Sequence, residues 1–270
     1  MDKSWRNIPS HNVLGRIEGS DPSLRKEVVV YSAHWDHFGW NPSLPGKKTD
    51  QIFHGAHDNA SGVAALLELA RAYRALPTPP RRSILFIATT AEERGLLGAQ
   101  YYATHPLIPL AHTVADINMD GMNVHGRTHD LEVIGYGNSD LEELLSQEAQ
   151  RQGRVMVPEQ VPEHGHFFRA DHFEFAKVGI PSLFLGTGMD FVGRPSGYGR
   201  AIIDHYTEHD YHKPTDIVRA DWDLSGAMQD LALLFRVGYD VAQADHVPRW
   251  KDGSEFKTKG DIRLQNQPSE

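Results

Sequence analysis

The chain contains no cysteine. This excludes disulfides and thiolate-bound zinc, so any zinc site must be built from histidine and carboxylate ligands. The chain also lacks an apolar run of about 18 residues, the length that a membrane-spanning helix requires. Its first residues, Met1-Asp-Lys-Ser-Trp5, lack the apolar stretch of a secretory signal. We therefore expect neither a membrane partner nor a signal peptide in this chain.

Positive charge is scarce as well. The net charge is −9, with 27 basic and 36 acidic residues, and no basic stripe runs along the sequence. This balance argues against nucleic acid as a partner. Histidine, in contrast, occurs 16 times. Because imidazole is the commonest metal ligand near neutral pH, the composition favours a metal site of nitrogen and oxygen ligands.

Strand-like and helix-like segments alternate along the chain. With 270 residues, 40% of them hydrophobic, the chain is long enough for one well-buried domain. The alternation predicts a single three-layer α/β domain with a central, mostly parallel mixed β-sheet flanked by helices. The expected strands are 27–32, 83–89, 113–118, 131–136 and 181–185, and the expected helices are 63–73, 140–152, 169–177 and 222–244. The glycine-rich segment 186–210 is expected to be a long connection that walls a substrate pocket.

Acidic and histidine side chains follow three of the expected strands. His34 follows the first strand, Glu92 and Glu93 follow the second, and Asp120 follows the third. Asp58 precedes the helix 63–73, where a carboxylate is well placed at a helix start. Because the carboxyl ends of parallel strands meet at one edge of a sheet, these side chains are expected to lie together.

Several carboxylates at one edge of the sheet require positive charge to balance their negative charge. Close carboxylates repel each other and have raised pKa values unless positive charge neutralises them. Two divalent cations would balance Asp58, Glu93, Asp120 and a bridging hydroxide, with Asp58 shared between the ions. Nitrogen and oxygen ligands without sulfur suit two zinc ions, with manganese or cobalt as possible substitutes.

Five short motifs stand in order along the chain: Ser32-Ala-His-Trp-Asp36, Gly55-Ala-His-Asp-Asn-Ala-Ser-Gly62, Thr90-Ala-Glu-Glu-Arg-Gly-Leu-Leu-Gly98, Asn118-Met-Asp120 and Tyr211-His-Lys-Pro-Thr-Asp216. Together they resemble the motifs of the M28 family of zinc-dependent exopeptidases, over roughly residues 25–245. The resemblance implies a peptidase catalytic domain over residues 27–247, after an irregular N-terminal segment (1–26) and before a polar C-terminal tail (248–270).

The resemblance also implies roles for individual residues. Asp58 would bridge two zinc ions. Glu93 and His212 would complete the coordination of one ion, and His34 and Asp120 that of the other.

The remaining roles concern catalysis and its surroundings. Glu92 would be the general base. Asp36 would orient the His34 ring by accepting its second N–H. Four further residues are candidates for positioning the ligands or contacting substrate: Arg169, Asp171, His172 and Asp216.

Other readings of the same residues stay open. His37 or His57 could replace His34 as a ligand, although His57 is expected to point away from Asp58. The favoured function is a two-zinc aminopeptidase acting on peptides with a free N-terminus. The alternatives are a glutaminyl-cyclase-like aminoacyltransferase with one zinc ion and a metal-free binding module. The family is commonly exported, so an extracytoplasmic location is expected, whereas the oligomeric state is left open.

Overall fold

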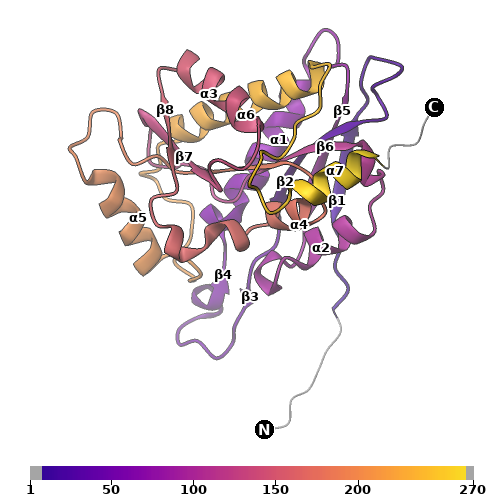
Figure 1. The fold of residues 1–270 in the computed structure, drawn as a ribbon. Coiled ribbons are helices and arrows are strands. Elements are labelled where there is room, and N and C mark those ends of the chain that lie inside the picture. The colour runs from indigo at the N-terminus through magenta and orange to yellow at the C-terminus, as the bar shows by residue number, and fades with distance from the viewer. Residues whose placement is uncertain (1–7, 266–270) are drawn as a thin grey trace.

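The computed structural model describes residues 8–265 and shows one twisted sheet with helices on both faces (Figure 1). The sheet has seven strands, which in sheet order are β1 (Val13–Ile17), β5 (Ser83–Thr89), β2 (Val28–His34), β6 (Thr113–Asn118), β9 (Ser182–Gly186), β7 (Asp130–Ile134) and β8 (Val155–Pro158). A small two-stranded hairpin, β3 (Gly39–Trp40) and β4 (Ile52–Phe53), projects from the domain. The predicted α/β architecture is confirmed.

The direction of the strands sets the position of the site. β5, β2, β6 and β9 run parallel to one another, while β1 and β7 run antiparallel to their neighbours β5 and β9. The carboxyl ends of β2, β5 and β6 therefore lie side by side. These ends carry His34, the turn with Glu92 and Glu93, and Asp120, as the sequence predicted.

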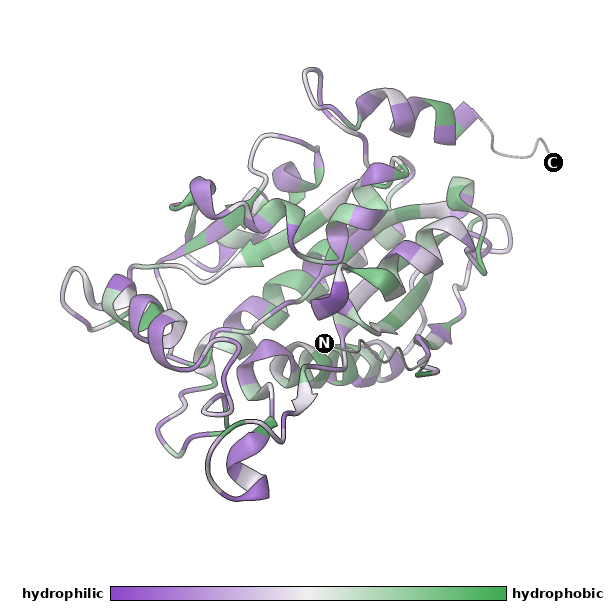
Figure 2. Ribbon diagram, turned by 90° about the horizontal axis from the view of Figure 1, so that it is seen from below, coloured by the Kyte–Doolittle hydropathy of each residue, from purple (hydrophilic) through white to green (hydrophobic). Residues whose placement is uncertain are grey.

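Alternate residues of β2 face opposite layers of the domain. Val29 and Tyr31 belong to the larger apolar cluster, which also contains residues of α1 (Gly62–Arg74), α3 (Leu141–Arg151) and α6 (Ser225–Gln243). Val28 and Val30 pack on the other face, against α2 (Leu97–Thr104) and α4 (His172–Lys177). Figure 2 shows the apolar residues concentrated on the strands and on the inward helices, with polar residues on the projecting segments. A strand buried on both faces explains the continuous apolar run in its sequence.

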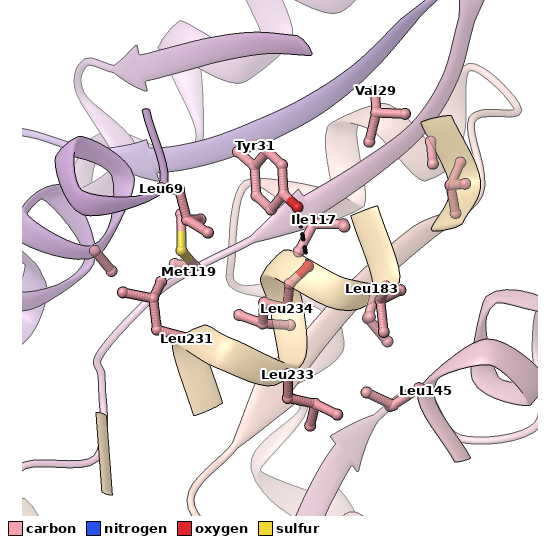
Figure 3. Packing of buried hydrophobic residues seen from close by; sticks show 14 of the residues in the cluster. Val29, Tyr31, Leu69, Ile117, Met119, Leu145, Leu183, Leu231, Leu233 and Leu234 are labelled. Atoms are coloured by element: carbon pink, nitrogen blue, oxygen red, sulfur yellow. Dashed lines mark hydrogen bonds between the residues drawn. The ribbon is translucent and has the colours of Figure 1, made fainter. Parts of the chain in front are cut away.

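The larger core contains Tyr31, whose hydroxyl is directed toward Leu234 of α6 (Figure 3). Its hydroxyl donates to the carbonyl of Leu234, at 2.9 Å, and lies 3.0 Å from the hydroxyl of Tyr73. The polar end of this buried ring is thus satisfied, and the ring fixes α6 against the middle of the sheet. No helix of residues 8–265 is long and apolar enough to cross a membrane.

Each of the two terminal segments contains an element that the sequence did not predict. Within the segment 1–26, expected to be irregular, Val13–Ile17 forms the edge strand β1 because it pairs with β5. Within the expected polar tail, Lys257–Gln265 forms α7. Trp250 and Phe256 pack into a third apolar cluster, which anchors this tail. Residues 1–7 and 266–270 of these two predicted segments lie outside the described residues.

The segment 186–210 also differs from expectation. Its second half is α5 (Tyr198–His209), a helix of 12 residues. Of these residues only Gly199 is buried. α5 therefore covers the edge of the domain without entering its core, and Figure 1 shows it at the periphery.

Candidate metal centre

Asp58 lies between two histidines that come from distant parts of the chain. Its Oδ1 is 3.1 Å from Nε2 of His34, and its Oδ2 is 3.2 Å from Nε2 of His212. Asp58 belongs to the short helical turn η2 (Ala56–Ser61), directly before α1. The two oxygens of one carboxylate thus face two separate imidazoles.

Each of the two imidazoles faces a second carboxylate. Nε2 of His34 lies 3.1 Å from Oδ1 of Asp120, and Nε2 of His212 lies 3.1 Å from Oε2 of Glu93. The arrangement is therefore symmetrical about Asp58, with one histidine and one further carboxylate on each side. Ligand atoms of His34, Asp58 and Glu93 all lie within 4.8 Å of one another. All five predicted ligands come together.

Two residues in this region have left-handed backbone conformations that are unusual outside glycine. Ala91, directly before Glu92, has φ of 55°, and His212 has φ of 56°. Such conformations cost of order 1–3 kcal/mol each and persist only where surrounding contacts impose them. They aim Glu92, Glu93 and His212 into the centre from tight turns.

The contact of Asp36 with His34 differs from the sequence prediction. Nδ1 of His34 lies 3.0 Å from the main-chain oxygen of Asp36, so the backbone, and not the carboxylate, accepts the ring N–H. β2 ends at His34, so the alternation of a strand no longer places Asp36 on the same side. The Asp36 carboxylate instead accepts the N–H of Ala91 at 2.8 Å and the hydroxyl of Thr90 at 2.8 Å. It thereby holds the turn that carries Glu92.

Asp216 and Asn59 hold Asp58 in place. The Asp216 carboxylate accepts the main-chain N–H of His57 at 2.9 Å and that of Asp58 at 3.0 Å. Asn59 donates to the carbonyl of Met119 at 2.9 Å and accepts the N–H of Gly121 at 2.9 Å. These bonds tie the turn η2 to the segment after His212 and to the end of β6.

The turn also meets β6 through close packing. A Cβ on Gly62 would lie 2.6 Å from the Met119 carbonyl oxygen, so only glycine permits this approach.

The neighbouring carboxylates favour the protonated, positively charged form of the two imidazoles. Burial opposes the charged form of His34, but Asp120 and Asp58 outweigh it and raise its pKa well above the usual value. His212 is likewise opposed by burial, yet Asp58 and Glu93 raise its pKa to about 9. Burial would raise the pKa of Asp58, but the two histidines lower it below its usual range. The carboxylates are therefore ionised and surround a position that a positive charge can occupy.

Glu92 differs electrostatically from Glu93. Burial, with the nearby Asp120 charge, raises the pKa of Glu92 to about 9. Burial also acts on Glu93, but His212 and His37 outweigh it and lower its pKa. Two adjacent glutamates therefore have opposite tendencies to hold a proton, which is the pattern expected for a proton carrier beside a ligand.

The other predicted residues lie around the centre. Asp171 precedes α4, is fully buried, and accepts the hydroxyl of Thr89. His172 is also fully buried, between the rings of Phe167 and Phe184. Arg169 is exposed and lies 3.4 Å from the hydroxyl of Tyr211. Asp171 and His172 thus lie in the interior behind the centre, and Arg169 at its rim.

Two aromatic side chains near His212, those of Tyr211 and Phe38, were not predicted as parts of the site. Tyr211 stacks on the His212 ring, with centroids 3.8 Å apart, and Phe38 meets the same ring edge-on at 4.8 Å. His37, one of the two alternative ligands, lies 2.6 Å from Oε1 of Glu93 through its Nδ1. Tyr211 adjoins His212 in the fifth motif, which is the signal that could have revealed it.

His57, the other alternative ligand, points away from Asp58 as expected. Its Nε2 bonds to the carbonyl of Met122 at 2.8 Å.

The residues fit divalent cations. Two imidazoles and three carboxylates supply nitrogen and oxygen donors, the set that zinc accepts in the absence of cysteine. Nδ1 of His34 donates to the Asp36 carbonyl, so the Nε2 lone pair faces the oxygens of Asp58 and Asp120. A cation between these atoms would replace the proton that His34 otherwise takes up. His34, Asp58 and Asp120 would hold one such ion, and His212, Asp58 and Glu93 a second.

The fold and this cluster of histidines and carboxylates place the chain among the α/β metallopeptidases. A sequence model of peptidase family M28 matches residues 12–236. The chain belongs to peptidase family M28, and the predicted family is confirmed.

Curated relatives match over shorter stretches. The chain is 34% identical over 103 residues to aminopeptidase YwaD of Bacillus subtilis, a match that covers 38% of this chain and 19% of the relative. It is 39% identical over 116 residues to aminopeptidase NAALADL1 of Mus musculus, covering 41% of this chain and 13% of the relative. The matched segments are therefore a small part of these longer proteins.

Solved structures share the fold over most of the chain. A zinc aminopeptidase from Bacillus subtilis superposes with a TM-score of 0.61 at 22% identity, covering 91% of this chain and 52% of that chain. The LapA aminopeptidase of Legionella pneumophila superposes with a TM-score of 0.59 at 20% identity, covering 87% and 54%. The chain thus spans about half the length of these structural neighbours.

Proposed function

We propose that this protein is a metal-dependent aminopeptidase that holds two zinc ions and removes the N-terminal residue from peptides. One observation carries the proposal: the two oxygens of Asp58 face His34 and His212, and each histidine faces its own second carboxylate. Family membership and the aminopeptidases among the relatives support the same activity.

Different groups of the site contribute to different steps of peptide hydrolysis. Bound zinc ions would lower the pKa of a water and stabilise negative charge on the substrate carbonyl oxygen. Glu92 takes a proton from the attacking water and passes it to the leaving amine. Burial raises the pKa of its carboxyl group, and the positive charge of bound zinc ions would favour the ionised form that accepts the proton. The Asp36 carboxylate keeps the Glu92 turn in place through Ala91 and Thr90.

Replacement of the two glutamates separately tests these roles. Glu92→Gln should keep both zinc ions but reduce kcat by about 10²–10⁴-fold, because glutamine cannot accept the proton. Glu93→Gln is the matched control, since it should weaken zinc binding at the His212 side. Turnover and zinc content are measured for both variants. If Glu92→Gln kept near-normal turnover, or lost zinc as Glu93→Gln does, the two roles would be wrong.

The metal count separates the proposed reaction from the two alternatives. Elemental analysis should give two zinc ions per chain, whereas a glutaminyl-cyclase-like enzyme would hold one and a binding module none.

Acetylation of the substrate tests recognition of the free N-terminus, because a blocked peptide should resist cleavage. An extracytoplasmic site of action belongs to the same proposal and is tested by locating the protein in cell fractions.

A further inference from the structure

A cavity of about 390 Å³ adjoins the turn that carries Asp58, since His57 and Asp216 line it. Helix α5 and the segment 215–222 form much of its wall, and His57 and His125 complete it. None of the five candidate metal ligands lines it. The volume falls in the range of pockets that hold small organic molecules, roughly 300–1,000 Å³.

The wall between this cavity and the metal centre is formed by residues that position Asp58. Asp216 lines the cavity and accepts the N–H groups of His57 and Asp58. The Tyr206 hydroxyl lies 3.4 Å from Asp216, and its ring meets that of His57 edge-on at 4.5 Å. The cavity is therefore adjacent to the centre but built from other side chains.

The lining combines aromatic faces with negative charge. Tyr198, Tyr206 and Trp222 contribute rings. The lining contains three aspartates, Asp210, Asp216 and Asp221, but only one guanidinium, that of Arg219. Arg219 lies 3.6 Å from both Asp210 and Asp221, so its charge is already compensated. Aromatic faces together with excess negative charge favour a cationic ligand.

Two histidines complete the lining. Nε2 of His57 lies 2.8 Å from the Met122 carbonyl oxygen, and this contact fixes the ring in the cavity wall. Burial lowers the pKa of His125 to about 4, so at neutral pH His125 adds no positive charge.

We propose that this cavity is a second binding site, for a small organic ammonium ion with an apolar or aromatic body. The rings of Tyr206 and Trp222 contact the body of the ligand, and the carboxylates of the lining compensate the charge of the ammonium group and accept its hydrogens. The site is separate from the metal centre. The ammonium group can belong to a free amine or to the basic first side chain of a bound peptide.

Calorimetric titration of the zinc-loaded full chain tests the proposal with three ligands of similar shape: 2-phenylethylamine, 2-phenylethanol and 3-phenylpropionate. The amine should bind at least about tenfold more tightly than the alcohol, a difference of about 1.4 kcal/mol, and the carboxylate should bind least. Saturating acetohydroxamate, a ligand of metal ions, should leave the amine affinity unchanged. Displacement by acetohydroxamate, equal affinities for amine and alcohol, or absence of amine binding would each overturn the proposal.

Two variants on α5 complete the test. Ala201 is exposed and lines the cavity, so Ala201→Trp should fill it and weaken amine binding at least about tenfold. Thr207 is exposed on the same helix outside the cavity, and Thr207→Trp is the matched control that should bind normally. Equal weakening by both variants would contradict the assignment.

Hydrolysis assays distinguish the two sources of the ammonium group, and this arm alone rests on the proposed function. If Ala201→Trp lowers kcat/KM for a lysyl-anilide but not for a leucyl-anilide, the group belongs to the substrate. If it changes neither while amine binding is lost, the ligand is a free amine.

Discussion

Two acidic clusters lie near the same part of the sheet, and they differ in what faces their carboxylates. In the metal centre, Asp58 lies between two imidazoles. In the interior behind it, Asp116 of β6 accepts the hydroxyl of Ser32 at 2.8 Å, and Asp171 accepts that of Thr89. The second oxygens of Asp116 and Asp171 have no hydrogen-bond partner in the described part of the chain.

The difference in partners changes the charge of the two clusters. Histidines lower the pKa of Asp58 despite burial, whereas burial raises the pKa of Asp171 to about 7 and that of Asp116 well above its usual value. Carboxyl groups that face only hydroxyls in the interior retain protons and need no cation. The partners of the carboxylates, more than the residue types, therefore distinguish the candidate metal site from a buried acidic cluster.

The largest effect is expected when the shared carboxylate is removed. Asp58→Ala should lose both metal ions and lower activity by more than the roughly 10–100-fold typical of residues that only support ligands. Zinc analysis and turnover measure this. Asp116→Asn is the matched change in the other cluster, where a neutral amide replaces a largely protonated acid, and zinc content and activity should remain near normal. Tight binding of two zinc ions by the Asp58→Ala variant would contradict the role of Asp58 as the ligand shared by both ions.

Chelation should destabilise the protein through the metal centre alone. Ions that bind only the folded state stabilise it by about 2.7 kcal/mol at 100 times Kd, and at roughly 2–4 °C per kcal/mol the melting temperature should fall by about 5–10 °C. Scanning calorimetry with and without chelator measures the change. Asp58→Ala should show no such shift, and an equal shift in that variant would place the stabilising ions elsewhere.

Removal of the Asp36 carboxylate separates the two contacts of that residue. Asp36→Ala keeps the main-chain oxygen that bonds to His34 but loses the bonds to Thr90 and Ala91. Activity should fall by about 10–100-fold. Zinc affinity should stay constant, and Asp36→Asn should fall between the variant and the native protein. A loss of zinc affinity as large as the loss of activity would instead indicate that the Asp36 carboxylate orients the His34 ring.

The smallest effect concerns the pH dependence of folding in the interior region. His172 is fully buried, neither of its ring nitrogens has a hydrogen-bond partner within residues 8–265, and burial lowers its pKa to about 3. The unfolded chain binds a proton below about pH 6.5 that the folded state rejects, so stability falls as pH drops, by about 1.4 kcal/mol per unit.

Exchange of the imidazole for a ring without titratable atoms tests this. Between pH 7 and pH 5, His172→Phe in the chelated protein should lose about 2 kcal/mol less free energy of unfolding than the native sequence. Urea denaturation at both pH values measures the difference. Parallel losses would show that His172 does not titrate in this range.

The central strands and the convergence of the site could be predicted from the sequence. Apolar runs on both faces marked β2, β5 and β6, and the residues after them had to meet because parallel strands share one edge. The segment β1 was missed because it is short, contains Gly15 and depends on pairing with β5. α7 was missed because its sequence is polar and Trp250 and Phe256 anchor the tail before it.

The contacts of the site were less predictable than its members. Asp36 changed partner because the strand ended two residues earlier than the alternation assumed. The stacking of Tyr211 on His212 depends on a left-handed backbone at His212, which residue types alone do not indicate. The pairing of Asp216 with the N–H groups of His57 and Asp58 joins segments far apart in the chain.

The outer strands of the sheet have a consequence for self-association. β8 has four residues and ends at Pro158, which has no N–H to offer a further strand. β1 has five residues, with exposed Gly15 and Arg16 on the opposite edge. Short edges that carry proline, glycine and charge are poor templates for addition of another chain. The molecule can therefore keep a strongly apolar sheet in its centre without offering either edge for aggregation.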